Sequence, residues 1–356
     1  MSVETVSRSS LAAGAWDNLV RNSTDGWTFA LNGWQELILE IPEWGLEEHS
    51  FAIKDGSMLM AVVPLQFSAA SGRISSSGWG GCGPIVSSKF EGKRRQSLLQ
   101  MAVDHCMSVG RERGATHFEL SISPVTQTSI ESPWGINPFS LTGMEDHSGL
   151  SQVIDLSISE EDLWAGLSPD ARRQIRIAKE NGYFVERANW IEHLERYYLL
   201  HETTYRRTGV TPHPKQYFVG IASKTALTDN SVLWAARSKS GEVVAYHNAA
   251  WFNAGASYHT GCSIEEAGEW GVSYLLFWEA MLGAKAAGIR WYDCGSIFPG
   301  TTNLKQKGLS TFKTKFGGEP HRFFKAEISL TDTSAVEIPS RGRWQKLVRR
   351  LLTSKE

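Results

Sequence analysis

The sequence predicts an α/β protein of mixed α+β type, built from two similar domains, and two observations support this prediction. A hairpin, followed later by a helix, a glycine and a strand, occurs once in each half of the chain. The two copies lie roughly 180 residues apart, which is typical of the duplication of a whole domain. At 356 residues the chain also exceeds what one hydrophobic core usually serves. We therefore expect two domains, each with a mixed, twisted sheet flanked by helices.

In the first half, turn residues and helix stops set the order of the elements. Asp55-Gly56 lies between two apolar runs, and Asp-Gly supplies the positive φ that a tight hairpin turn requires. Gly114 follows an amphipathic stretch and is expected to end that helix. The expected elements are helices at 11–16 and 34–41, a hairpin at 51–66, a helix at 96–113 and a strand at 117–123.

The second half repeats this order after several additional helices. Ser168-Pro169 opens one of them with a preferred N-cap residue and with Pro at the first helical position. Gly288 is expected to stop a later helix, as Gly114 does in the first half. The expected elements are helices at 160–167, 168–181, 191–207 and near 216–218, a hairpin at 232–252, a helix at 273–287 and a strand at 290–295.

A segment rich in Ser, Pro, Gly and Asn, residues 123–149, lies between the halves and is expected to connect them. We thus expect an N-terminal domain at 1–150, a C-terminal domain at 151–335 and a basic amphipathic helix at 336–356. Such a helix can lie on an anionic membrane surface, and packing on its own domain is the alternative.

The composition is that of an ordinary folded protein, with 41% apolar and 21% charged residues. The four cysteines have no paired spacing, which favours neither a zinc site nor a disulfide framework. The N-terminus lacks a basic segment followed by an apolar run, and no stretch of about 18 apolar residues occurs. We expect a cytoplasmic protein that does not span the membrane.

Charge is distributed unevenly. Residues 301–356 contain 12 Lys and Arg but only 5 Asp and Glu, although the whole chain has a net charge of −2. A basic C-terminal region suggests an anionic partner, which could be a phosphate, a nucleic acid or an anionic lipid surface. A solvated tail is the alternative of equal weight.

The helix that Ser168 opens carries four cations. Arg172, Arg176 and Lys179 share one face because they are three and four residues apart, and Arg173 lies beside them. Cations near the start of a helix oppose its dipole, so a phosphate-bearing ligand is one interpretation. Salt bridges to the other domain, or solvent exposure, are the alternative.

Residues 292–318 are expected to form the cleft around which the chain is organised. A strand ending near Asp293 leads into a loop with glycines and lysines, and then into a second, aromatic-rich strand around Phe312. Such an arrangement brings a carboxylate and cations to one place, as binding sites often do. Lys313 and Lys315, two residues apart on that strand, would face opposite sides.

Four segments match motifs of a known family. They are Arg172–Gly182, with the pattern R-x-x-I-R-x-A-x-x-x-G; Glu202–Gly209 followed by Tyr217-Phe218, with the pattern T-x-x-R-x-G … Y-F; Tyr292–Gly295; and Gly308–Gly318, which contains Phe312-Lys313-x-x-Phe316-Gly317-Gly318. In this order they resemble the FemAB/FemX peptidyltransferases and the related FemAB-like acyltransferases. The resemblance covers residues from about 165 to about 325, and the N-terminal half fits only in architecture.

The resemblance implies two tandem domains of the GNAT fold, in agreement with the inferred duplication, and places catalysis in the C-terminal domain. It implies transfer of an aminoacyl group from aminoacyl-tRNA to an amine of a peptidoglycan precursor or a related cell-envelope acceptor. No metal and no cofactor besides the donor are implied. In relatives, the lysine of the Phe-Lys pair stabilises charge at the reaction centre, which makes Lys313 the first catalytic candidate.

Other site residues follow less directly from the resemblance. Tyr217 matches a tyrosine that holds the acceptor in relatives, whereas His213 stands where they have an arginine, so the acceptor itself is open. Asp293 is the candidate base for the attacking amine, with Glu202 as second choice; capping of the next turn by Asp293, or proton transfer by the substrate, are the alternatives. The remaining candidates for substrate binding are Arg206, Arg207, Arg172, Arg176, Phe312 and Lys305.

Two alternative functions remain open at this point. One is an acyl-CoA-dependent N- or O-acyltransferase of polysaccharide or natural-product biosynthesis. The turn Glu265–Gly271, where a pyrophosphate would bind, carries three carboxylates, which disfavours CoA. The other is a non-enzymatic protein that binds tRNA or a membrane through its basic C-terminus. The sequence does not indicate an oligomeric state.

Overall fold

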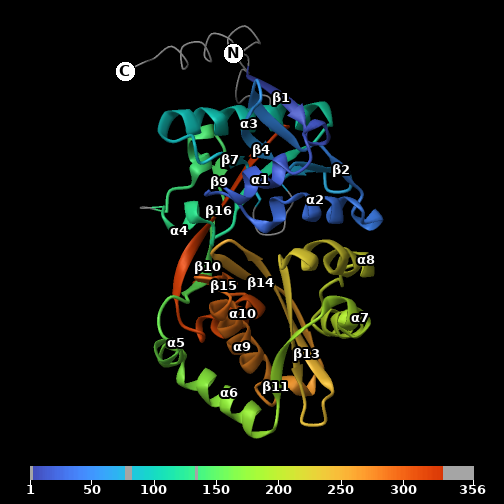
Figure 1. Ribbon diagram of the computed structural model, residues 1–356, viewed down its shortest axis with the longest axis vertical. Helices are drawn as coiled ribbons and strands as arrows, with labels where there is room; N and C mark the ends of the chain where they lie inside the picture. Colours follow the sequence, from blue (N-terminus) through green and yellow to red (C-terminus); the bar gives the residue numbers. More distant parts are fainter. Residues whose placement is uncertain (1–2, 77–81, 133–134, 332–356) are drawn as a thin grey trace. The chain divides into compact units, whose positions relative to one another are not determined.

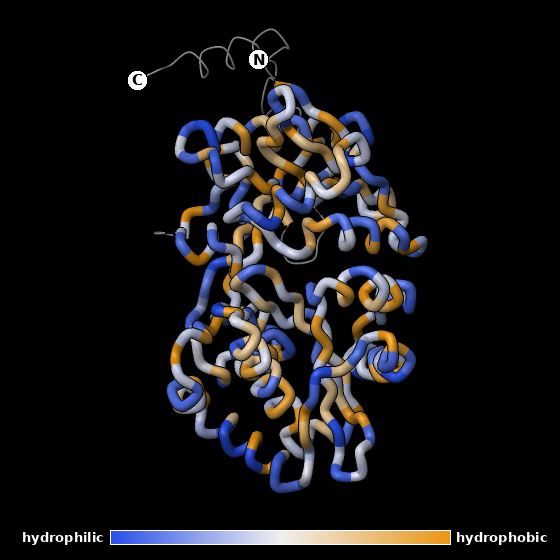
Figure 2. The backbone as a smooth tube through the Cα atoms, viewed as in Figure 1, coloured by the Kyte–Doolittle hydropathy of each residue, from blue (hydrophilic) through white to orange (hydrophobic). Residues whose placement is uncertain are grey.

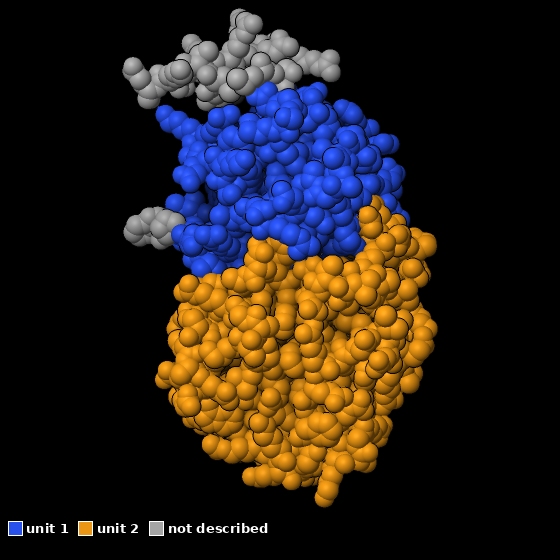
Figure 3. Space-filling view, in the orientation of Figure 1, with its two compact units in different colours: residues 1–35, 44–148, 324–356 blue, residues 36–43, 149–323 orange. Residues whose placement is uncertain are grey.

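The computed structural model describes residues 3–76, 82–132 and 135–331. Contacts divide the chain into two units, which Figure 3 shows in separate colours. Unit 1 comprises residues 1–35, 44–148 and 324–356, and unit 2 comprises residues 36–43 and 149–323. The sequence placed the junction at 150, close to the change at 148–149. It did not anticipate that residues 36–43 belong to unit 2, or that the chain returns to unit 1 at Phe324.

Unit 1 contains two sheets (Figure 1). The first is antiparallel and has the order β1 (Val3–Ser7), β3 (Phe51–Asp55), β4 (Met58–Val63) and β7 (Ile85–Val86). The second has the order β2 (Leu46–Glu48), β5 (Gln66–Ser68), β6 (Arg73–Ser75), β8 (His117–Ile122) and the second half of β16 (Glu319–Ser329), with β9 (Glu145–Asp146) paired to β16. Within it, only β6 and β8 run parallel. The predicted hairpin at 51–66 is confirmed, and Gly56 takes the positive φ of 59° that its turn requires.

The long helix α3 (Gly92–Glu112) supplies much of the core of unit 1. Its buried apolar residues recur every three or four positions: Leu98, Leu99, Ala102, Val103, Cys106 and Met107. The predicted helix at 11–16 is wrong in position, because α1 spans Ala15–Arg21. The buried residues of α1 are Trp16, Leu19 and Val20. Gly14, the residue before the helix, has a positive φ of 77°. The other α-helices among the described residues of unit 1 are α4 (Gln127–Ile130) and the first half of α2 (Asn32–Leu39).

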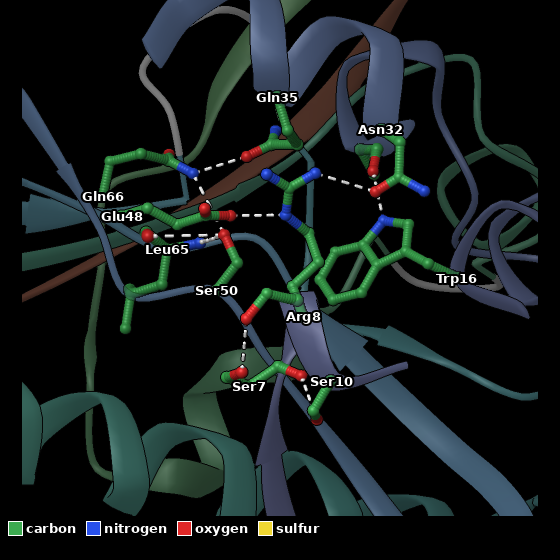
Figure 4. Close-up of polar contacts among 12 residues, drawn as sticks. Ser7, Arg8, Ser10, Trp16, Asn32, Gln35, Glu48, Ser50, Leu65 and Gln66 are labelled. Atoms are coloured by element: carbon green, nitrogen blue, oxygen red, sulfur yellow. Dashed lines mark hydrogen bonds and ion pairs between the residues drawn. The ribbon is translucent and has the colours of Figure 1, made fainter. Parts of the chain in front are cut away.

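A partly buried set of polar contacts lies at the end of β1 (Figure 4). The Arg8 guanidinium donates to the Glu48 carboxylate through Nε. Its Nη1 donates to Asn32 Oδ1 at 2.8 Å. Behind it, the amide of Gln66 donates to Gln35 Oε1. Asn32 and Gln35 both come from α2, so these hydrogen bonds join the start of α2 to β2, to β5 and to the residue that follows β1.

Unit 2 is built on one mixed sheet. Its order is β11 (Phe184–Ala188), β12 (Ser231–Arg237), β13 (Val243–Phe252), β14 (Gly255–Ser263), β15 (Trp291–Ile297), β10 (Gly149–Asp155) and the first half of β16. All neighbours are antiparallel except β14 and β15. The helix α9 (Val272–Ala286) makes the crossover that a parallel pair requires. The predicted class, α/β with mixed sheets flanked by helices, is confirmed.

Helices cover both faces of this sheet, as the complete burial of β13 requires. Alternate residues of a strand point to opposite faces. Thus Trp251 and Ala249 pack in one core with α5 (Glu160–Gly166), α6 (Pro169–Glu180) and α9. On the other face, Tyr246 packs against Tyr197 of α7 (Trp190–Arg207), which is followed by α8 (Lys215–Gly220) (Figure 1).

The local signals for these helices are borne out. Ser168 caps α6, because its Oγ accepts from the Ala171 N–H at 3.1 Å, and Pro169 occupies the first position. Figure 2 shows α6 alternating between hydrophilic and hydrophobic residues, as expected of a helix with one buried face. Gly288 follows α9 with a φ of 82°, and Gly182 follows α6 with a φ of 79°.

The aromatic-rich strand expected around Phe312 is wrong. Residues Leu304–Thr314 form a helix, α10, and the strand begins only at Glu319. The Asn303 side chain caps α10 by accepting from the Gln306 N–H. Phe312, in the last turn of α10, packs against Phe316, which lies two residues beyond the end of the helix. Lys313 therefore projects from a helix.

Two expectations concern membranes. The basic helix expected at 336–356 lies outside the described residues. Within the part of the chain that the structure describes, no helix has both the length and the apolar character needed to cross a bilayer.

Two glycines in helices of unit 2 provide a matched pair for testing the packing. A Cβ at Gly283 in α9 would overlap the indole ring of Trp234, whereas a Cβ at Gly308 in α10 would meet nothing within 4 Å. We expect Gly283→Ala to lower the free energy of unfolding by about 1–3 kcal/mol through overpacking. Gly308→Ala should raise it by about 0.5–1 kcal/mol through helix propensity. Urea unfolding of both variants tests this, and equal effects would contradict the packing of α9 on β12.

Candidate active site

The sheet of unit 2 opens at the end of its one parallel pairing. β14 and β15 pair at Gly255–Trp291, Ala256–Tyr292 and Ser257–Asp293, and not beyond, although both strands continue. β14 goes on paired with β13, and β15 goes on paired with β10. We call this point the fork.

Asp293, the sequence candidate for a base, lies at the fork and is 5% exposed. Three groups donate hydrogen bonds to its carboxylate. Ser151 Oγ of β10 and the Gly295 N–H, the latter at 2.7 Å, both donate to Oδ1. Ser257 Oγ of β14 donates to Oδ2 at 3.0 Å. Three neighbouring strands thus each contribute one side chain, and both carboxylate oxygens are occupied.

Lys313, the first catalytic candidate, reaches the same place from α10. Its Nζ donates to the Ser296 carbonyl oxygen at 2.8 Å. Gly295 leaves room for it, since a Cβ there would lie 2.8 Å from Lys313 Nζ, and its φ is 96°. The neighbouring candidate Phe312 anchors the helix by packing on Tyr274 and Phe277 of α9. Lys313 and Asp293 are neighbours but form no ion pair in the described structure.

Burial affects both groups, in opposite directions. It raises the pKa of Asp293, and the hydrogen bonds from Ser151, Gly295 and Ser257 and the charge of Lys313 oppose this rise. Burial lowers the pKa of Lys313, and the charges of Asp293 and Cys294 oppose this fall. Each group therefore helps the other to stay charged.

A second set of candidates lies on the other face, under α7 and α8. Tyr217 is fully buried, and its hydroxyl lies 2.8 Å from His259 Nε2. His259 is the extra residue of a bulge in β14, because Thr260 pairs with Asn248 and Tyr258 with Ala249. His213 stacks on Tyr217 with a ring separation of 5.0 Å. The two residues expected to bind substrate, His213 and Tyr217, are thus brought together, with Tyr217 facing His259 of the sheet.

Sequence reasoning missed several members of this site. His201, fully buried on α7, accepts from the His213 N–H at 3.0 Å, and His247, buried on β13, lies next to the Tyr292 hydroxyl. Histidines within apolar stretches were the available signal. Ser151 and Ser257 carried no such signal, because single serines in strands are common and only the strand order places them beside Asp293.

The basic residues of α6 already have partners. Arg172 donates to the carbonyl oxygens of Ala165 and Leu167 at 2.8 and 2.6 Å, and so caps the end of α5. Arg176 lies over the Trp164 ring at 5.6 Å. Arg173 pairs with Asp170, and Lys179 pairs with Glu279. All of these partners lie within unit 2, whereas the alternative for this helix expected salt bridges to the other domain.

The remaining basic candidates gather where α7 ends and α10 begins. Lys305 Nζ donates to the Thr208 carbonyl oxygen at 3.1 Å. Arg207, next to Thr208, is exposed, and Arg206 pairs with Glu202 at 2.7 Å. An exposed cationic surface therefore lies at the opposite end of α10 from Lys313.

Two cavities are relevant to the search for a site. One, of about 170 Å³, lies beside Gly317 and Gly318 and is bordered by Trp291 and by Asp155, Asp162 and Glu319. The other, of about 360 Å³, lies in unit 1 between the end of β1, residues 48–51 and α3. Among the described residues, no group of three or more His, Cys, Asp and Glu could hold a metal ion.

Comparisons with known proteins bear on the fold. Residues 169–306 match a family model described as acetyltransferase (GNAT) domain. No relative was found among curated proteins. The solved structure of FemX is 14% identical, with a TM-score of 0.67, and the match covers 90% of this chain and 96% of that one.

Two further structures are similar. The C-terminal domain of a putative lysylphosphatidylglycerol synthetase from Agrobacterium fabrum is 14% identical, with a TM-score of 0.56 and coverage of 88% and 90%. A tandem GNAT protein from the clavulanic acid biosynthesis pathway is 13% identical, with a TM-score of 0.53 and coverage of 94% and 100%. The chain therefore has the fold of two tandem GNAT-like domains, and the resemblance to FemX is confirmed at the level of fold.

The buried histidines predict acid sensitivity. Burial lowers the pKa of His201 and of His247 to about 3, well below the ordinary value of 6.5. The unfolded chain therefore binds these protons first, so stability should fall as the pH drops from about 6.5 towards 4, by on the order of 1 kcal/mol per unit for each histidine. Urea unfolding at several pH values measures this slope.

Variants identify the groups responsible. His247→Gln should flatten the dependence on pH below 6.5, because one proton-binding group of the unfolded chain is removed. His147→Gln is the control, since that side chain is 47% exposed. An unchanged slope in His247→Gln would contradict the assignment.

Proposed function

We propose that the protein is a GNAT-type acyltransferase that moves an aminoacyl group from aminoacyl-tRNA to an amine of a peptidoglycan precursor or a related cell-envelope acceptor. The observation that carries the proposal is the ammonium of Lys313 held at the fork of a FemX-like fold, beside buried Asp293. The motif resemblance around Lys313 supports the same reaction. A cytoplasmic location, where charged tRNA is available, belongs to the proposal.

The geometry suits an attack on an ester. When the amine nitrogen bonds to the ester carbon, the carbonyl oxygen becomes an oxyanion until the bond to the tRNA ribose breaks. A fixed cation in a site sheltered from water stabilises that charge by several kcal/mol. Lys313 supplies such a cation, and its partly buried position strengthens the interaction.

The proton of the amine must leave during this step, and the ribose oxygen must take one up. Asp293 is buried and both of its oxygens accept hydrogen bonds, which favours a role as the counter-charge of Lys313 over that of a base. Glu202, the second choice, pairs with Arg206 on the surface of α7. We therefore infer that proton transfer passes through the substrates or solvent.

The start of α9 argues against CoA as the donor. Glu265, Glu266 and Glu269 are exposed around it and would repel a pyrophosphate. α6 also closes this end of the helix, because a Cβ at Gly271 would lie 2.9 Å from Gln174 Oε1 and closer still to the Gln174 carbonyl oxygen. The helix N-terminus is thus occupied by protein.

An acyl-CoA-dependent transferase is the second candidate. It is favoured by the match of residues 169–306 to the acetyltransferase (GNAT) domain model and by the fold shared with the tandem GNAT protein of the clavulanic acid pathway. The non-enzymatic alternative, a tRNA- or membrane-binding protein, depends on the basic C-terminus alone.

Donor use separates these candidates. The full-length protein is incubated with a mixture of charged tRNAs or with acetyl-CoA, together with muropeptide precursors or phosphatidylglycerol as acceptors. We expect transfer from charged tRNA, and its loss after RNase treatment. Transfer that RNase leaves unchanged would exclude the tRNA donor, and consumption of acetyl-CoA would favour the second candidate.

Lys313 provides the sharpest mutational test. Lys313→Ala should lower kcat about 10²- to 10³-fold, the usual effect of removing an oxyanion-stabilising group. Lys313→Arg should recover part of the loss. Lys307→Ala is the matched control, because Lys307 is exposed on the same helix, and it should keep full activity. Intact turnover in Lys313→Ala would refute the enzyme proposal.

A further inference from the structure

Asp293 and Lys313 each have their own hydrogen-bond partners at the fork. Asp293 is next to Lys313 and acts on its charge, yet the described structure contains no ion pair between them. Asp293 instead accepts from Ser151, Ser257 and the Gly295 N–H, and Lys313 donates to the Ser296 carbonyl. A buried carboxylate and a neighbouring ammonium normally attract each other into direct contact.

We propose that Ser151 and Ser257 are positioning residues that hold the Asp293 carboxylate away from direct contact with Lys313, so that the ammonium remains available to substrate. The consequence for turnover rests on the proposed function of Lys313. The effect on the charge of Lys313 is independent of the proposed function.

The strand order makes this restraint possible. Ser257 and Asp293 are the last paired residues of β14 and β15, so their side chains lie beside each other on one face. On the opposite side of β15, a register shift of β10 between Ser151 and Val153 brings Ser151 to the carboxylate. The carboxylate is therefore held from both neighbouring strands, with one oxygen directed to each serine.

The groups that can influence Lys313 are few. Asp293 and Cys294, both on β15, raise its pKa, and its direct contact is with the uncharged Ser296 carbonyl. The Cys294 thiol is buried, and burial raises its pKa. Lys315 is occupied elsewhere, since it pairs with Asp170 at 2.7 Å. Asp293 is thus the carboxylate whose position determines the charge of Lys313.

Two variants of the full-length protein should shift the pKa of Lys313 in opposite directions. Asp293→Asn removes the negative charge and should lower this pKa by about one unit or more. Ser151→Ala with Ser257→Ala frees the carboxylate to pair directly with Lys313 and should raise it by about one unit. Competitive labelling of Lys313 with acetic anhydride across neutral to alkaline pH, read by mass spectrometry, measures both shifts without any need for turnover.

Turnover gives the second readout. In the double serine variant the Lys313 ammonium pairs directly with Asp293. The kcat of this variant should therefore be about tenfold lower, while its KM changes little. Ser257→Ala alone, a milder change, should show the same direction for both measurements, which keeps the test valid if the double variant folds poorly. Ser263→Ala on β14 is the control, because Ser263 Oγ does not contact Asp293.

The outcomes separate the two proposals. A labelling curve that is unchanged in Asp293→Asn, or that shifts in the same direction in both variants, would overturn the positioning role. If the opposite shifts appear but Lys313→Ala transfers normally, the positioning role stands and the proposed function fails.

Discussion

The short parallel pairing of β14 with β15 is the constraint on which the site of unit 2 depends. Because the pair is parallel, α9 must cross the sheet between the two strands, and its apolar residues become the core beneath them. Because the pair ends at Ser257 and Asp293, the backbone of β15 beyond this point needs other partners. Side chains provide them: Asp293 accepts from the Gly295 N–H, and Lys313 donates to the Ser296 carbonyl. The same two residues thus complete the sheet and form the candidate site.

Placing these charges at the fork has an energetic cost that the local structure offsets. Burial favours the neutral form of both Asp293 and Lys313. Without partners, the buried carboxylate would tend to gain a proton and the buried ammonium to lose one. Hydrogen bonds to the charged carboxylate from two hydroxyls and one N–H oppose this tendency, because each stabilises the charged form. A direct ion pair would offset the cost as well, but it would leave Lys313 with less capacity to stabilise charge on a substrate.

The sequence was informative where the signal is local. Asp55-Gly56, Ser168-Pro169 and Gly288 each fix a backbone geometry within a few residues, and the elements they predicted are present. The hairpin at 232–252 and the helix-glycine-strand order also sufficed for the fold class. α10 was missed because its outer face is polar and Gly308 lies in its middle, so the spacing of Phe312 and Phe316 was read as part of a strand.

The candidate site was predictable only in part, for a related reason. Lys313 and Asp293 were named from their types and motifs, whereas the groups that hold Asp293 come from strands far apart in sequence. Ser151 is 142 residues from Asp293, and no local pattern connects them. The contact between Tyr217 and His259 likewise depends on a bulge in β14, which the sequence does not reveal.

The glycines of the C-terminal motif have structural explanations that limit what the motif can say about substrate. A Cβ at Gly317 would lie 2.9 Å from the Gly166 carbonyl oxygen, and one at Gly318 would overlap the Val153 carbonyl. Gly295 leaves room for Lys313 Nζ. Each glycine thus permits a close approach that places Lys313 and the start of β16. The motif therefore reports the geometry of the candidate site. Under the proposed function, we expect discrimination among donors and acceptors to depend on residues outside the motif, such as exposed Arg207 and Lys305 or the acidic turn before α9.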